Sequence, residues 1–208
     1  MKHTNQNFNN QKLIYKKANN MMVFSITDHT NDTWDIETYN NLIIKFVQFD
    51  PKTNNANIYI PIYVDANEFR AVCASILAGT FSKINFGSKN DSKGTFISYG
   101  GSKNGGLAKK RMNGQLVPII TNKPEARWLI MSFGTDGYFY VKGQVYEGSV
   151  AYGGAITKQG KPVAELFFKL TQEDVLVMAQ TVVSYLQAKE TLALSTWQRL
   201  NAPHQKVG

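Results

Sequence analysis

The feature that most constrains this chain is a β-hairpin followed at once by a capped amphipathic helix, a pattern that occurs twice, 106 residues apart. In the first copy, residues 42–49 and 57–64 alternate between apolar and polar or aromatic side chains, which predicts two strands, and 50–55 forms a proline- and asparagine-rich turn. Asp65 is a suitable helix cap, and Gly79 is a suitable helix end. The apolar stripe between them consists of Phe69, Val72, Cys73, Ile76 and Leu77.

The second copy has the same order of elements. Residues 150–157 and 163–170 are predicted strands, and the glycine- and proline-containing segment 158–162 is the predicted turn. The capping residues and the apolar stripe then return in ungapped register with the first copy: Thr171, Asp174, Val175, Met178, Ala179, Val182, Val183 and Leu186. We therefore predict an α+β fold made of two pseudo-repeated units of antiparallel strands, each followed by a helix.

The rest of the chain divides around these two units. We expect a basic flexible tail at 1–17, a first strands-plus-helix unit at 18–82, a basic insert rich in glycine and lysine at 83–125, a second unit at 126–191 and a C-terminal tail at 192–208. Further strands are predicted at 21–27, 33–39, 95–99, 115–120, 127–133 and 138–146. The strands at 95–99 and 115–120 would flank a long mobile loop, and Asp-Gly at 136–137 marks a tight turn.

Positive charge is concentrated in two segments. The formal net charge is +8; residues 1–20 contain four lysines and no acid, and 83–111 contain seven cations against Asp91 alone. Clustered cations suit a polyanion, because each phosphate that they neutralise releases condensed counterions. The plainer interpretation, that lysines in tails keep the protein soluble, remains open.

Several function classes have little support in the sequence. The three histidines lie in the tails or beside a predicted turn (His3, His29 and His204), so no metal-ligand spacing is present, and no nucleophile or phosphate-loop motif occurs. We expect neither an enzyme nor a cofactor. The single cysteine, Cys73, lies on the apolar stripe and indicates a reducing, cytoplasmic setting, and no apolar run is long enough to cross a membrane.

Aromatic residues recur on the predicted strands. Tyr59 and Tyr63 alternate with isoleucines, so they would face away from the helix if the isoleucines face it, and Phe167 lies among charged residues in the second copy. Exposed rings beside lysines are how proteins hold unpaired bases, although aromatic residues also fill sheet cores. The expected phosphate contacts are Lys103, Lys109, Lys110, Arg111, Lys12, Lys16 and Lys17, and the expected stacking residues are Tyr59, Tyr63, Tyr99, Tyr138, Tyr140 and Tyr152.

Two strands-plus-helix units, at 42–79 and 150–186 with the strands that precede them, resemble the Whirly and PC4-like family of single-stranded DNA-binding proteins. The resemblance implies sheets that form the nucleic-acid surface and helices that pack beneath them and build homo-oligomers. The lysine-rich strand motif of that family has no close copy here; residues 106–110 are nearest in composition but lie between the units, so no residue role is carried over.

We therefore expect a non-enzymatic protein that binds single-stranded DNA, or RNA, with little sequence preference. Its asparagine and lysine content is typical of an AT-rich genome and suits a phage or plasmid. Three alternatives stay open: a structural or assembly protein whose basic loop docks a protein partner, an OB-fold binder built on one five-stranded barrel, and a small-molecule enzyme.

Overall fold

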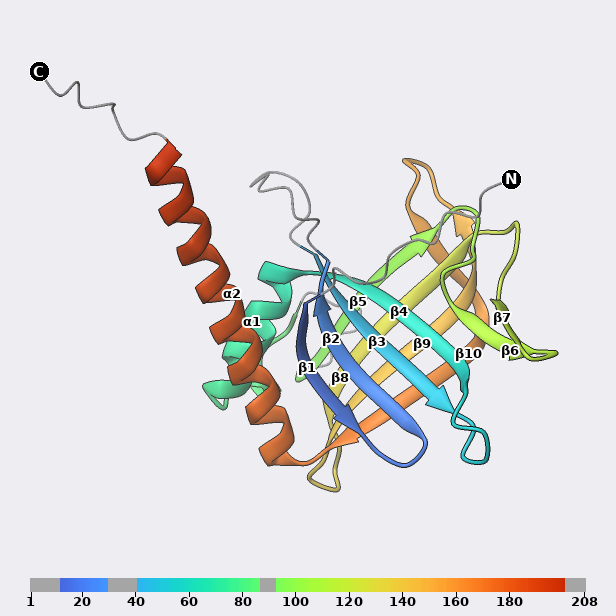
Figure 1. Cartoon of the computed structure of the whole chain (residues 1–208), viewed down its shortest axis with the longest axis horizontal. Coiled ribbons are helices and arrows are strands. Elements are labelled where there is room, and N and C mark those ends of the chain that lie inside the picture. Colours follow the sequence, from blue (N-terminus) through green and yellow to red (C-terminus); the bar gives the residue numbers. More distant parts are fainter. Residues whose placement is uncertain (1–11, 30–40, 87–92, 201–208) are drawn as a thin grey trace, which may run out of the picture.

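The computed structural model describes residues 12–29, 41–86 and 93–200. Within these residues the chain forms two antiparallel β-sheets, with two helices lying side by side along one flank (Figure 1). The predicted α+β class is confirmed as two sheets and two helices. The strand predicted at 33–39 lies outside the described residues.

Each sheet contains four strands in chain order that lead into a helix. In the described residues, sheet A has the order β1 (Leu13–Ala18), β2 (Met22–Asp28), β3 (Asn41–Phe49), β4 (Ala56–Asp65), β6 (Lys109–Met112) and β7 (Gln115–Pro118), and sheet B has the order β10 (Ile156–Leu170), β9 (Phe139–Val150), β8 (Glu125–Phe133) and β5 (Thr95–Ser102). Helix α1 (Ala66–Leu77) follows β4, and α2 (Gln172–Leu200) follows β10. A short 3-10 turn, η2 (Phe81–Lys83), follows α1.

The two sheets share one hydrophobic core. Alternation turns every second side chain of each strand inward, which buries Phe24, Ile26, Ile44, Phe46, Ile60 and Ile62 of sheet A and Leu129, Met131, Val141, Leu166 and Phe168 of sheet B. The sheets pack tightly at Gly143, where a Cβ atom would lie 2.7 Å from the Phe46 ring. Glycine at this position therefore lets the Phe46 ring lie directly on the backbone of β9.

Both helices begin as predicted. The Asp65 carboxylate accepts hydrogen bonds from the backbone N–H groups of Asn67 and Glu68, each at 2.9 Å. At α2, the Asp174 N–H donates to Thr171 Oγ1 while the Thr171 N–H donates to the Asp174 carboxylate, which is a reciprocal capping box. The apolar stripes of both helices are buried, except that Leu77 is partly exposed and Val183 half-buried.

The two ends of the chain hold more secondary structure than predicted. Residues 13–17, expected in a tail, belong to β1, because Tyr15 packs its ring against Phe24 and Lys17 forms an ion pair of 2.6 Å with Asp174. At the other end, α2 continues to Leu200 through a segment expected to be a tail from residue 192 onward. The tail prediction was therefore wrong at 13–17 and 192–200, because strand pairing and helix propagation depend on more than composition; residues 1–11 and 201–208 lie outside the described residues.

The basic insert is also more ordered than predicted. The strand at 95–102 does not pair with 115–118; it pairs with β8. Lys109–Met112, placed in a mobile loop, is β6, which pairs with β7 across Asn113 (φ 49°) and Gly114 (φ 80°). Positive φ at both central residues is the geometry of a type I′ hairpin turn, for which Asn-Gly is the preferred sequence.

The second hairpin turns earlier than predicted. The turn lies at 151–155, where the Ala151 N–H donates to the Ala155 carbonyl, and Gly153 and Gly154 both take positive φ. The predicted turn at 158–162 lies inside β10, at the point where its pairing with β9 shifts register between Gln159 and Ala164. A glycine pair determines this turn, while the glycine and proline of 158–162 mark an irregularity in the strand.

Candidate nucleic-acid interface

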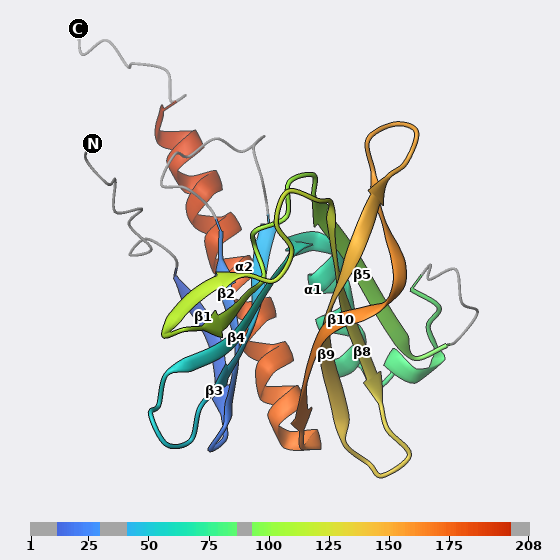
Figure 2. The same cartoon turned by 90° about the vertical axis from the view of Figure 1, so that its right-hand side faces the viewer.

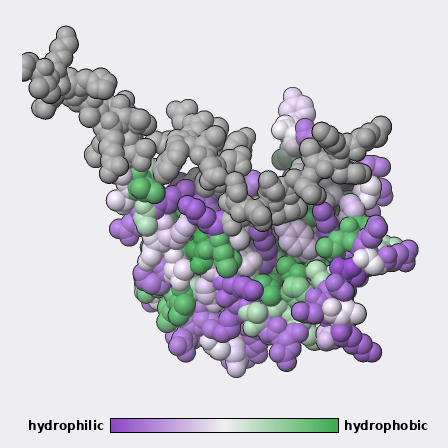
Figure 3. Space-filling view, in the orientation of Figure 1, coloured by the Kyte–Doolittle hydropathy of each residue, from purple (hydrophilic) through white to green (hydrophobic). Residues whose placement is uncertain are grey.

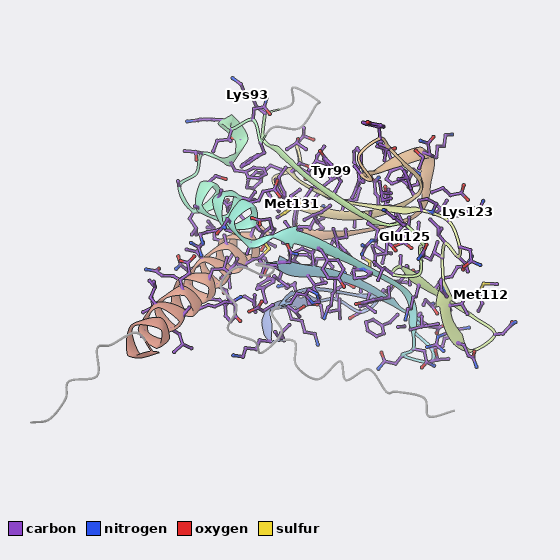
Figure 4. All side chains as sticks on the ribbon, turned by 90° about the horizontal axis from the view of Figure 1, so that it is seen from above. Lys93, Tyr99, Met112, Lys123, Glu125 and Met131 are labelled. Atoms are coloured by element: carbon purple, nitrogen blue, oxygen red, sulfur yellow. The ribbon has the colours of Figure 1, made fainter. Side chains whose placement is uncertain are left out.

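The outer side of sheet B is an aromatic surface. Burial of Leu129 and Met131 on one side of β8 leaves Trp128 on the other, and the pairing of β5 with β8 sets Tyr99 directly beside it. Figure 4 shows Tyr99 on the outer side of β5 and Met131 between the sheets. Tyr99 is 66% exposed, far more than a tyrosine in a sheet core.

Three rings on this side form a continuous row, which we call the Trp128 cluster: Tyr99, Trp128 and Tyr146. The Tyr99 and Trp128 centroids are 5.9 Å apart and the rings are inclined by 35°, and the Trp128 and Tyr146 centroids are 5.8 Å apart. The Lys158 Nζ atom lies 3.8 Å from the Trp128 centroid and 5.0 Å from that of Tyr146. These distances are those of cation–π contacts.

Lys158 reaches the rings because the end of the β9–β10 hairpin bends over the sheet. This segment, residues 146–160, is the β9–β10 arm, and it projects beyond the other strands (Figure 2). A Cβ atom at Gly101 would lie 2.5 Å from the Ile156 side chain, so the arm rests directly on the backbone of β5. Lys103 extends its Nζ atom toward Gly154 in the arm. The arm therefore brings Lys158 to the Trp128 cluster, and Lys103 lies beside the arm at Gly154.

A second aromatic group lies further along the same face. This Tyr140 cluster consists of Tyr138, Tyr140 and Phe167, with Lys169 lying 3.8 Å from the Tyr138 centroid. Lys169 also forms an ion pair of 2.8 Å with Asp136, to which the Tyr140 hydroxyl donates at 2.7 Å. Unlike Lys158, which has no ion pair among the described residues, Lys169 is held in place by a carboxylate.

The Asp136 network yields a prediction about titration. The hydrogen bond from Lys169, followed by that from Tyr140, lowers the pKa of Asp136 to about 2. Because the folded value lies below the unfolded one, the network favours the folded state above about pH 4 and loses this effect as the pH falls toward 2. Replacement of Lys169 by methionine should move the Asp136 midpoint back toward about 4, as measured by NMR titration of the carboxyl carbon. An unchanged midpoint would contradict the assigned cause, and Tyr140→Phe should shift it less.

A buried ion pair joins the two sheets and the base of the β6–β7 hairpin. Arg127 Nε lies 3.2 Å from Glu125 Oε1, and both side chains are almost fully buried. The Glu125 carboxylate accepts a hydrogen bond from the Ala108 N–H, while Arg127 donates to the carbonyl of Pro61 on β4. Burial raises the pKa of Glu125, and Arg127 and the backbone amides of 106–108 oppose that effect. Figure 4 shows Glu125 where these elements meet.

Tyr59 and Tyr63 do not share the aromatic face of sheet B. They lie on β4 of sheet A, opposite the buried isoleucines as predicted, but both are half-buried. The Tyr63 ring contacts the Arg127 guanidinium at 5.4 Å and the His29 ring at 5.0 Å, and burial raises the pKa of Tyr59 to about 12. The prediction of open tyrosines was wrong here because the neighbouring elements cover them.

On the side of the molecule seen in Figure 1, hydrophobic patches alternate with hydrophilic side chains (Figure 3).

The predicted cations separate into three places. Lys103 lies beside the arm, whereas Lys109, Lys110 and Arg111 belong to β6 of sheet A, between β4 and the edge strand β7. Arg111 is used structurally, since it donates to the carbonyls of Ala56 and Gly114. Lys12, Lys16 and Lys17 lie in or just before β1, the edge strand on the opposite side of sheet A; Lys12 and Lys16 are exposed, and Lys17 is paired with Asp174. Among the predicted stacking residues, Tyr152 is fully exposed at the tip of the arm.

Sequence reasoning missed the centre of this surface. Trp128, Tyr146, Lys142 and Lys158 were not among the predicted site residues. The alternation within 128–131 could have shown that Trp128 and the buried Leu129 lie on opposite sides of the strand. On the same face as Trp128, Lys142 forms an ion pair of 3.5 Å with Glu165. No pattern in the sequence shows that Lys158 lies over Trp128, because the register shift in β10 produces that contact.

Other kinds of site find no support in the part of the chain that the structure describes. Its histidine, cysteine and carboxylate side chains form no group of three that could hold a metal ion. None of the described helices has the length and apolar character needed to cross a membrane. Comparison with known proteins found no matching family model, no similar curated protein and no similar solved structure.

Proposed function

We propose that this protein binds single-stranded DNA, or RNA, without strong sequence preference, on the outer face of sheet B. The single observation that carries the proposal is the Trp128 cluster: a row of three rings, open at Tyr99, half-buried at Trp128 and buried at Tyr146, with a lysine that has no ion pair among the described residues. Successive bases of a single strand stack on such rings whatever their identity, while cations beside them follow the phosphates. In a duplex the base faces are already stacked on each other, so the rings have nothing to bind.

The surrounding charges fit a strand that crosses the ends of β5 and β8. Bases would stack on Tyr99 and Trp128, and Lys158 and Lys103 would contact phosphates from the arm side. The Tyr140 cluster is a weaker candidate, because Asp136 places a carboxylate beside its rings and already binds its lysine. In each sheet, four strands that follow one another along the chain lead into a helix, and this arrangement supports the resemblance to Whirly-like proteins. Among the described residues the sheets have six and four strands, which differs from the five-stranded barrel of an OB-fold.

The test is fluorescence anisotropy with labelled single-stranded and double-stranded oligonucleotides over a range of salt concentrations. We expect single-strand binding whose log K falls linearly with log salt, by about 0.7 for each phosphate contacted, and much weaker duplex binding. Oligonucleotides of different composition but equal length should bind within a few-fold of one another. Equal affinity for duplex would contradict the proposal, and no affinity for any strand would favour a protein-docking role instead.

A further inference from the structure

The position of Lys158 in the free protein raises a specific question, because its ammonium group occupies the place where a base would stack. The Nζ atom lies 3.8 Å from the centre of the Trp128 ring, close to the distance of a stacked base. A base therefore cannot stack on this side of Trp128 unless Lys158 leaves. The same lysine is the nearest cation to any phosphate that would accompany that base.

We propose that Lys158 is an exchangeable cap: it covers the Trp128 ring in the free protein and moves to a phosphate when a base takes its place. This inference rests on the proposed function and adds the order of contacts to it. One side chain thereby acts in two ways, competing with the base for the ring and then binding the phosphate that accompanies the base.

Three observations favour exchange over a fixed contact. Lys158 is exposed, and it has no ion pair among the described residues, so only the two rings hold it. Lys169 provides the internal comparison: it lies at the same 3.8 Å from a tyrosine ring but is also bound by Asp136 at 2.8 Å. A lysine held by cation–π contacts alone changes rotamer quickly and at low cost, whereas one that is also paired does not.

The arm fixes the backbone at Lys158, so only the side chain of this lysine needs to move in the exchange. Ile156 rests on Gly101 two residues before Lys158, so the backbone at the base of this side chain is fixed against β5. The ammonium can therefore swing away from Trp128 while the strand that bears it stays in place. Lys103, whose Nζ atom lies close to Gly154, adds a second cation beside the arm.

Exchange predicts an unusual effect of Lys158→Ala on single-strand binding. Loss of one phosphate contact should reduce the salt slope by about 0.7, which weakens binding at low salt. At high salt, where phosphate contacts add little to the binding free energy, loss of the competing cap should strengthen binding by about two- to fivefold. The log K against log salt lines of wild type and variant should therefore cross, at roughly 0.1–0.4 M salt.

Matched variants isolate the cap. Lys110→Ala removes an exposed lysine that has no ring contact among the described residues, so it should weaken binding or leave it unchanged at every salt concentration. In a Trp128→Ala background, Lys158→Ala should still reduce the slope but should give no gain at high salt. Trp128 fluorescence, read in protein that also carries Trp34→Phe and Trp197→Phe, should change with Lys158→Ala before any DNA is added.

The outcomes separate the two proposals. If wild-type protein binds no single strand, the proposed function is wrong. If it binds but the lines converge without crossing, Lys158 is a plain phosphate contact, and if they run parallel with the variant tighter, it is a cap that never reaches a phosphate. Either of these two results overturns the exchange while leaving single-strand binding intact.

Discussion

Trp128→Ala should weaken single-strand binding more than any other single substitution on the surface. Stacking of one base on an aromatic side chain contributes about 1–3 kcal/mol, which corresponds to roughly a 5- to 150-fold rise in Kd. Trp128 is the middle ring of the row, so its loss also leaves Tyr99 and Tyr146 without their shared neighbour. Anisotropy titration at a fixed salt concentration gives the change in Kd directly.

The controls follow from the geometry. Trp128→Phe keeps a ring and should recover most of the affinity, while Tyr99→Ala removes an end ring and should cost less than Trp128→Ala. Because stacking does not depend on counterion release, the salt slope of Trp128→Ala should match that of wild type. A folded Trp128→Ala variant that binds as tightly as wild type would remove the Trp128 cluster from the interface.

Breaking the pair of Glu125 and Arg127 should cause the largest loss of stability. Removal of one partner from a buried ion pair leaves an uncompensated charge and costs about 3–5 kcal/mol. Glu125→Gln should therefore lower the free energy of unfolding steeply, since Arg127 is only 3% exposed and water can compensate little of its charge. Urea denaturation followed by circular dichroism measures the loss.

A double-mutant cycle tests whether the charge or the packing matters. Glu125→Gln combined with Arg127→Met removes both charges, so it should be more stable than the sum of the two single losses predicts. The pair also joins three elements, because Glu125 binds the Ala108 N–H and Arg127 binds the Pro61 carbonyl. Losses that simply add would mean that the two charges do not depend on each other.

What the sequence predicted well was local. The caps Asp65 and Thr171 and the apolar stripes are confirmed, because a helix start and its buried face depend on residues three or four positions apart. The hairpin across Gly134–Gly137 is likewise confirmed, with the Gly134 N–H donating to the Tyr138 carbonyl. The turn at 158–162 was wrong because a strand irregularity and a turn attract the same residues.

The candidate site was predicted less well, for a physical reason. Tyr99 was found, but its neighbour Trp128 belongs to β8, which residues 103–124 separate from β5, so only the pairing of β5 with β8 brings the rings together. The basic insert drew attention by its composition, yet Arg111 is engaged with backbone carbonyls of the hairpin and β4. Charge density along a sequence does not show which cations are already occupied.

The contacts that join the two sheets and their helices determine whether the outer face of sheet B changes shape when a ligand binds. At one end Arg70 pairs with Glu190 across the two helices, at the other Arg127 connects β8 to β4, and between them the Phe46 ring lies on Gly143. Because these three contacts join the described parts of the two sheets, we expect the sheets to move together as one body. A strand that binds sheet B would then meet a surface already in its final shape, and the ordering cost would fall on the strand and a few lysine side chains.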